Sequence, residues 1–258
     1  MKRLRSIMMW CAALSVLMAT VIAHADGKLN ISNWKEILPE PAYAQLVGES
    51  IKNLTSFTSS PSQFNQNGKK VQAEATNLII FAEIAHRAGD SKASGLRKVA
   101  VELLAAAKAK KGDEAKSITA SLADYKNLTG DNKDADLGKL TSLGTIMNGP
   151  VKEVDRNLTQ YKRLTSTSLG AKGKAEEVQA NMYRMAAMAV ATSAHVPTEL
   201  PDGKTAKDWL DSAEAMRKHA LEAATAAKDK KLQELKKAVN DLTASCAKCH
   251  DDFRVETN

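Results

Sequence analysis

The sequence predicts an all-α protein built from two copies of one helical unit. Ala, Leu, Lys, Glu and Gln are frequent, and aromatic residues, which favour strands, make up only 4% of the chain. No segment shows the sustained alternation of a strand, whereas several show apolar residues at spacings of three and four. Residues 93–122 match residues 213–242 at 13 of 30 positions without a gap, which indicates an internal duplication. The expected architecture is two tandem antiparallel four-helix bundles.

The first copy is expected to span residues 26–135 and to hold four helices separated by turn-forming residues. Ser59-Ser60-Pro61 separates the first helix from the second, and Gly89-Asp90 the second from the third, because these residue types interrupt helical patterns. A polar segment rich in Gly, Asn and Asp, residues 129–136, links the two copies. The apolar spacing places the helices at residues 34–58, 68–87, 91–110 and 113–128.

The second copy, residues 136–258, repeats short segments of the first at gapped offsets. Asn157-Leu158-Thr159 matches Asn53-Leu54-Thr55, and Val178-Gln179-Ala180 matches Val71-Gln72-Ala73. Because the matches occur in order in several segments, duplication explains them better than shared composition does. The helices are expected at residues 137–165, 174–194, 205–228 and 231–254, with a turn-forming segment at 196–203.

Residues 1–25 have the organisation of an export signal. Three basic residues precede an apolar run over residues 7–22, and Ala23-His24-Ala25 supplies a small-x-small cleavage pattern. The run is short for a membrane span and no second one follows, so no stable membrane span is expected after its removal. A retained membrane anchor is the alternative. Cleavage would leave 233 residues in the periplasm, with Cys246 and Cys249 as their only cysteines.

The expected mature chain is only mildly basic. The chain has 37 Lys and Arg, three of them in the signal, so 34 remain against 30 Asp and Glu, a net charge of +4. Basic and acidic residues are interleaved, as in Lys110-Lys111-Gly112-Asp113-Glu114, which indicates solvated helix faces. No nucleic-acid partner is therefore expected.

The last expected helix carries the strongest functional signal. Cys246-Ala247-Lys248-Cys249-His250 has the C-x-x-C-H pattern by which c-type haem is attached. Two thiols three residues apart match the two vinyl groups of one porphyrin, and the following His can ligate its iron. Such attachment takes place outside the bacterial inner membrane, in agreement with the export signal. Both cysteines continue an apolar seam at spacings of three and four, formed by Leu232, Leu235, Val239, Leu242, Cys246, Cys249 and Phe253.

The first copy lacks this chemistry. At the offset of 120 residues, Lys126, Thr129 and Gly130 occupy the positions of the two cysteines and the histidine. One covalent haem c per chain is therefore expected, on the second copy.

This motif at the end of a four-helix unit resembles the class II c-type cytochromes, the cytochrome c′ family. The resemblance covers residues 137–258 and is most specific in residues 246–254. It implies that His250 is the proximal iron ligand and that Arg254 lies on the same side of the haem. It also implies a residue of the first helix on the distal face, where Met147 is the candidate contact and sixth ligand. Because the family commonly forms homodimers, the haemless copy is expected to pack on the other as a pseudo-dimer.

Two histidines are alternative sixth ligands. His195 ends its helix just before Val196-Pro197, and its counterpart His86 lies in the copy without haem, which favours a local structural role. His219 is expected at the bundle surface.

A haem in this setting indicates single-electron transfer with periplasmic redox partner proteins, because Met and His ligation raises the potential of the iron. The alternative is a five-coordinate haem that binds a small gas, NO or CO, as a sensor or scavenger. Peroxide reduction would need a distal acid–base group, which no sequence feature provides, so the protein is not expected to be an enzyme. Zinc binding by Cys246, Cys249 and His250 would need a fourth ligand and seldom uses three so close in sequence.

Overall fold

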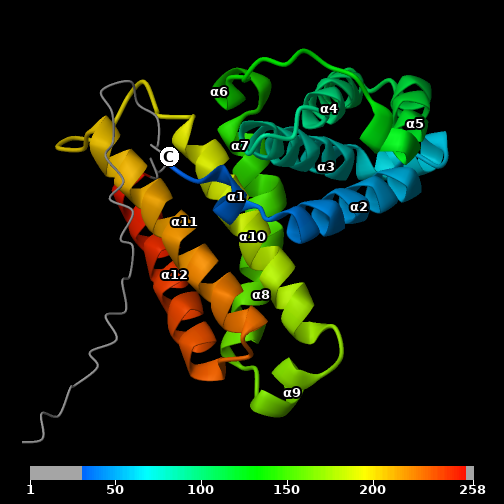
Figure 1. Cartoon of the computed structure of the whole chain (residues 1–258). Helices are drawn as coiled ribbons and strands as arrows, with labels where there is room; N and C mark the ends of the chain where they lie inside the picture. Colours follow the sequence, from blue (N-terminus) through cyan, green and yellow to red (C-terminus); the bar gives the residue numbers. More distant parts are fainter. Residues whose placement is uncertain (1–30, 254–258) are drawn as a thin grey trace, which may run out of the picture.

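The structure, a computed structural model, consists of helices and their connections (Figure 1). It describes residues 31–253; the expected signal at residues 1–25 and the candidate residue Arg254 lie outside the described residues. Within this range there is no strand, which confirms the all-α prediction. None of the helices in this range combines the length and the apolar character that crossing a lipid bilayer requires.

The first half starts with a short helix, α1, and a break at Leu38 and Pro39. Its longest helix, α3, begins at Pro61 rather than at residue 68. Ser60 Oγ accepts a hydrogen bond from the Gln63 N–H at 3.2 Å, and Pro suits the first helical position. The elements are α1 (Trp34–Ile37), α2 (Glu40–Phe57), α3 (Pro61–Arg87), α4 (Ala93–Lys108), α5 (Gly112–Ser121) and the 3₁₀ helix η1 (Leu122–Asn127).

In the second half the helix expected over residues 137–165 is broken, so that prediction was wrong. Thr141 is extended, with ψ at 179°, and ends α6. Pro150 lies inside the π-helical turn η2, because its missing N–H cannot join a regular α-helical ladder. The elements are α6 (Leu137–Leu140), α7 (Leu143–Ile146), η2 (Met147–Val151), α8 (Lys152–Lys162), α9 (Ser166–Gly170), α10 (Lys174–Ser193), α11 (Ala206–Lys228) and α12 (Leu232–Phe253).

Each half packs four helices in a closed order. In the first half α2 contacts α3, α3 contacts α4, α4 contacts α5, and α5 contacts α2. In the second half α8, α10, α11 and α12 follow the same order. Fully buried side chains such as Leu54, Leu103, Met185 and Val239 join both sets in one continuous core. Burying one side chain of this size stabilises the fold by about 1.5–3 kcal/mol.

Local geometry recurs at the offset of 120 residues. Lys110 and Lys230 are the two non-glycine residues with positive φ between residues 31 and 253, at 58° and 55°. Each ends a helix in the left-handed conformation, and the next N–H donates to the carbonyl five residues earlier. The two bonds are Lys111 to Ala106 at 3.0 Å and Lys231 to Ala226 at 2.9 Å. Both helices therefore end in the same capping motif.

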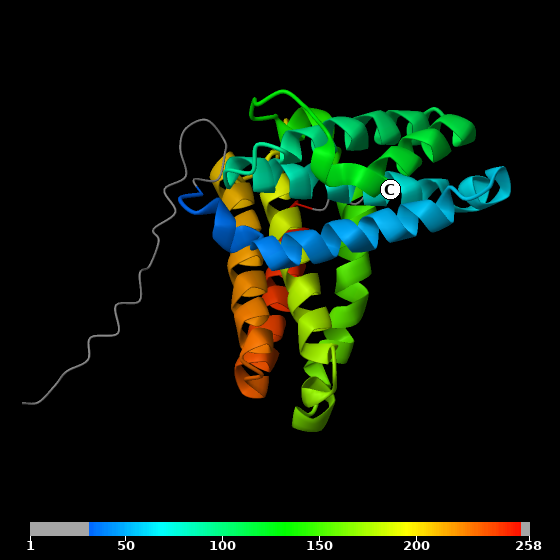
Figure 2. The ribbon, with the colours of Figure 1, turned by 45° about the vertical axis from the view of Figure 1, so that its right-hand side comes forward.

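The helices of the two halves cross rather than lie parallel. α2 and its neighbours cross α10 in the part of the second half that lies away from α9 (Figures 1 and 2). α3 also contacts η2, where a Cβ added at Gly149 would lie 2.8 Å from Ala73 Cβ. Arg184 of α10, whose side chain is 5% exposed, pairs with Glu49 of α2 at 3.0 Å and with Glu153 of α8 at 3.6 Å. One buried guanidinium thus joins the halves.

Candidate haem attachment site

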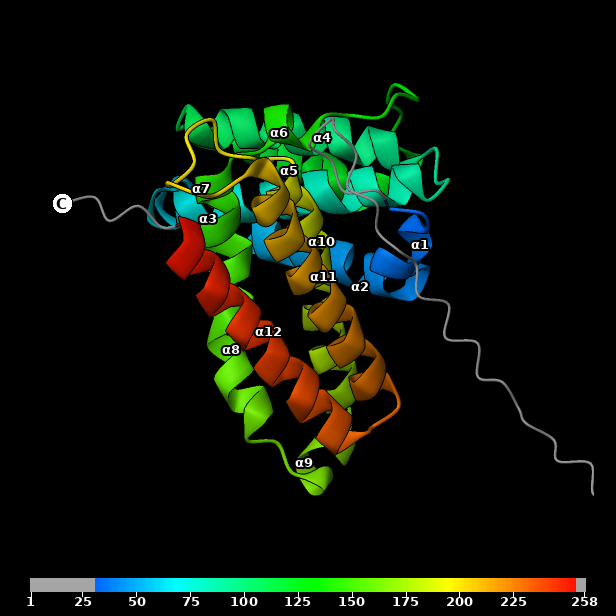
Figure 3. The same cartoon turned by 90° about the vertical axis from the view of Figure 1, so that its left-hand side faces the viewer.

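The candidate site lies on the C-terminal part of α12, where the buried face of this helix reaches the surface. Leu235, Val239 and Leu242 are fully buried. Cys246 and Cys249 follow on the same face and are half-buried, with Cys246 packed against the core. The apolar face therefore opens gradually towards the end of α12, which is the end of the second half near α6 and α7 (Figure 3).

Both thiols are free and are held in their protonated form. Burial, with Asp155 and the second cysteine nearby, raises the pKa of the Cys246 thiol from 9.0 to about 11. Burial and the Asp252 carboxylate also raise the pKa of Cys249. No disulfide joins the two residues. Two S–H groups on one helix face are the reactants that addition to two vinyl groups requires.

In the protein without haem, iodoacetamide is expected to alkylate Cys246 about a hundredfold more slowly at about pH 8 than in the urea-unfolded chain. The thiolate is the nucleophile, and its fraction falls by that factor when the pKa rises from 9.0 to about 11. Trypsin cuts after Lys248, so mass spectrometry follows each cysteine on its own peptide. The difference between the two alkylation rates should narrow above about pH 11, where the Cys246 thiol is ionised in both the folded and the unfolded protein. Equal rates at about pH 8 would contradict the expectation.

Ion pairs and an aromatic contact fix the end of α12. Asp252 Oδ1 accepts a hydrogen bond from Lys204 Nζ at 2.6 Å, and its other oxygen accepts one from Lys248. These two hydrogen bonds lower the pKa of Asp252. The rings of Trp209 and Phe253 meet edge to face with centroids 5.2 Å apart. The helix that carries both cysteines therefore remains regular to its last described turn.

His250 follows the second cysteine and is exposed. Its imidazole forms no hydrogen bond or ion pair with another residue between 31 and 253, so a ring nitrogen is available to a ligand. No three His, Cys, Asp or Glu side chains in the described range converge as a metal ion held by protein alone would require. A haem iron needs no such cluster, because the porphyrin supplies its equatorial ligands. Two free thiols, an available imidazole and a half-buried apolar face fit a covalently attached haem.

Met147 is half-buried and begins the π-helical turn η2. This turn packs on α3 and α10, whereas α12 packs along α8 and α11. Such turns often occur at functional sites. Contact between Met147 and a haem remains a prediction.

His195 and His219 have local partners. His195 Nε2 lies 2.9 Å from Thr141 Oγ1, and burial lowers the pKa of His195. His219 Nδ1 lies 3.0 Å from a carboxylate oxygen of Glu222 on the same helix. These contacts give each ring a structural role at its own position.

In the first half, the counterpart of α12 ends before the positions that correspond to Cys249 and His250. After Lys126 in η1, residues 128–130 cross the start of α4. A Cβ added at Gly130 would collide with the backbone of Ser94, and one at Gly95 would collide with the backbone of Leu128. This close approach of two backbones requires glycine on both sides. The helix that continues to Phe253 in the second half therefore has no continuation here.

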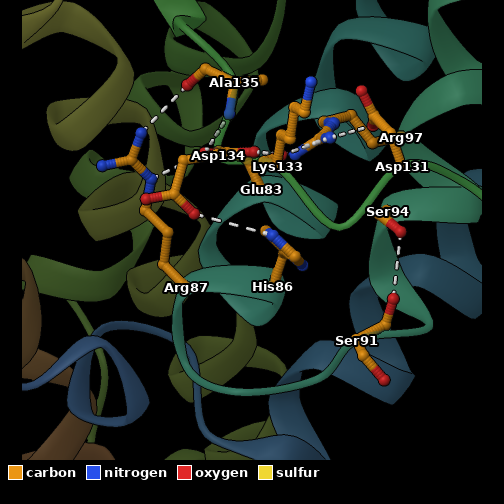
Figure 4. A network of polar contacts seen from close by, with 10 residues as sticks. All are labelled: Glu83, His86, Arg87, Ser91, Ser94, Arg97, Asp131, Lys133, Asp134 and Ala135. Atoms are coloured by element: carbon orange, nitrogen blue, oxygen red, sulfur yellow. Dashed lines mark hydrogen bonds and ion pairs between the residues drawn. The ribbon is translucent and has the colours of Figure 1, made fainter.

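The first half also contains a buried ion-pair network that the sequence did not predict (Figure 4). Glu83 of α3 is fully buried and accepts hydrogen bonds from Arg87 Nε at 2.6 Å and from Arg97 of α4. Arg97, whose side chain is 5% exposed, also donates to Asp131 at 2.8 Å, and the Ala135 N–H donates to Glu83 at 2.9 Å. The network fixes the segment between the halves onto the first half.

Comparisons of the chain with protein-family models, with curated proteins and with solved structures found no match.

Proposed function

We propose that this protein is a periplasmic c-type cytochrome that carries one haem c on Cys246 and Cys249 and transfers single electrons between redox partner proteins. The observation that carries the proposal is the C-x-x-C-H sequence on the half-buried face of a helix that stays regular to Phe253. Both thiols are free, and His250 is exposed beside them. The motif thus has the reactants, the ligand and the apolar surface that one attached haem needs.

Attachment forms two thioether bonds without an oxidant. The sulfur of each cysteine bonds to one carbon of a vinyl group, and the thiol proton goes to the other carbon. His250 would hold the iron through a ring nitrogen, and the apolar face of α12 would cover part of the porphyrin. When bound, the haem supplies the one-electron chemistry, while the protein sets the ligand, the burial and the access of solvent.

The proposal includes two duplicated four-helix bundles, the second of the cytochrome c′ type. The recurrence of the Lys110 and Lys230 caps and the matching order of helix contacts support the duplication. Residues 26–135 contain no cysteine, and the first half contacts the second through α2 and α3. Its proposed role is that of a built-in pseudo-partner in place of a second subunit.

Met147 is the proposed sixth iron ligand, which would give a low-spin haem suited to electron transfer. The second candidate function is the binding of NO or CO at a five-coordinate iron. The observation that favours it is the packing of η2 on α3 and α10, since this turn is held by helices other than α12. The two functions differ only in what occupies the distal side of the iron.

Absorption spectra of the protein, produced with a haem-attachment system, test the proposal. We expect haem c bands in the oxidised and reduced protein, in a low-spin form unchanged by CO. The variant Met147→Leu keeps an apolar side chain without ligating sulfur, and it should become high-spin and respond to CO. A wild-type protein that is already high-spin and responds to CO would support the gas-binding function. The absence of any haem band would refute both.

A further inference from the structure

The first half contains a cavity of about 660 Å³. Its walls come from the break before α2, the end of α3, the start of α4 and the end of η1, with Leu38, Tyr43, Ala88, Ala93 and Tyr125 among them. Ligand pockets in proteins commonly have volumes of about 300–1,000 Å³. The cavity therefore has room for a small organic molecule.

The cavity lies where the repeat places the counterpart of the haem site. Lys126, which lines it, corresponds to Cys246 at the offset of 120 residues. Tyr43 corresponds to Met147 in the register that aligns Leu54 with Leu158. None of the residues that line the cavity is Cys or His, so they offer a haem neither attachment nor an imidazole ligand. The first half thus keeps a space there without the haem chemistry.

Tyr43 supplies the most specific polar group of the cavity. It is 9% exposed and lines the cavity, and its hydroxyl forms no hydrogen bond with another residue between 31 and 253. Burial, with Asp90 and Tyr125 nearby, raises the pKa of Tyr43 above its usual value. The phenol is therefore a neutral hydrogen-bond donor with no acceptor among residues 31–253. Its side chain is nine-tenths buried, and its hydroxyl is open to the cavity.

The charged residues of the cavity nearly balance. Lys35, Lys92 and Lys126 line it together with Glu40 and Asp90, and all five are exposed. Because these side chains extend into solvent with both signs present, they give the interior little preference for an ion. The remaining determinants are an apolar wall and phenolic donors.

We propose that this cavity binds an uncharged, flat, conjugated ring with carbonyl oxygens, of the quinone class, and that the Tyr43 hydroxyl donates a hydrogen bond to one of those oxygens. The quinone ring would lie against the apolar wall, with Tyr125 at the edge. The proposal stands on the cavity and on Tyr43, and it requires no haem in the second half.

Titration of the full-length protein with duroquinone, followed by equilibrium dialysis, tests the proposal. We expect saturable binding at one site, and binding about tenfold weaker in Tyr43→Phe, which loses the hydroxyl alone. Tyr183→Phe is the matched control, because Tyr183 is half-buried on α10 outside the cavity. Durene has the same carbon skeleton as duroquinone but lacks the oxygens. Its affinity for wild type should be no higher than the affinity of duroquinone for Tyr43→Phe.

Three results would overturn the proposal: no saturable binding to wild type, equal binding by the two phenylalanine variants, or tighter binding of the anion benzene-1,3-disulfonate that is lost in Lys126→Gln. The haem bands of the same samples report on the proposed function separately. The quinone result and the haem result can therefore fail independently.

Discussion

Replacement of both motif cysteines by serine, Cys246→Ser with Cys249→Ser, is expected to abolish covalent haem. The two thiols are the only ones in the expected mature chain, so no other residue can form a thioether bond. In wild type the haem should stay with the polypeptide after acid–acetone extraction, and in the double variant all of it should be extracted. Mass spectrometry of the intact chain gives the same answer through the presence or absence of one haem mass.

The single variants and a neighbouring residue provide the controls. Cys246→Ser and Cys249→Ser should each keep one thioether bond, with a shifted reduced spectrum. Ser245→Ala removes only a hydroxyl that donates to the Leu242 carbonyl at 2.7 Å, and it should keep the full haem content. Haem that remains attached in the double variant would contradict the assignment of these cysteines.

Arg97→Met is expected to lower the free energy of unfolding by about 3–5 kcal/mol, because it leaves the Glu83 carboxylate buried without its main partner. Glu83 is fully buried between Arg87 and Arg97. The same substitution releases Asp131 and so loosens the segment between the halves. Urea unfolding followed by circular dichroism measures the loss.

The repeat provides a matched control for this variant. Arg217 stands 120 residues after Arg97, but it pairs with the half-buried Glu214 three residues before it on the same helix. Arg217→Met should therefore cost about 1 kcal/mol or less, as pairs near the surface usually do. Equal losses in the two variants would show that Glu83 does not depend on Arg97.

The sequence predicts the ends of a helix well where the extent of one apolar face alone determines them. α10, α11 and α12 agree with the expected ranges to within one residue at each end. The prediction was wrong over residues 137–165, where the extended Thr141 breaks the helix and Pro150 changes its hydrogen bonding to that of a π-helical turn. A proline inside an apolar pattern can begin, kink or end a helix, and packing against α3 and α10 decides which of these happens.

The candidate haem site could be found from the sequence because its groups are local. Two cysteines and a histidine within five positions share one end of a helix in any fold that keeps the helix. The network around Glu83 joins residues far apart in the chain. Residue spacing along the sequence does not show which distant residues come into contact. One signal was present: a carboxylate in the apolar run over residues 78–85 needs a buried partner. The cavity near Tyr43 left no such signal, because it depends on the closure of four separate segments.

Arg184, which pairs with both halves, makes their charges depend on each other. Arg184 is almost wholly buried and has one carboxylate in each half, Glu49 and Glu153. A charge lost from either glutamate changes what the other must neutralise, so substitutions at the two positions have non-additive effects. Neither half can therefore change its charge at this junction without a compensating change in the other half.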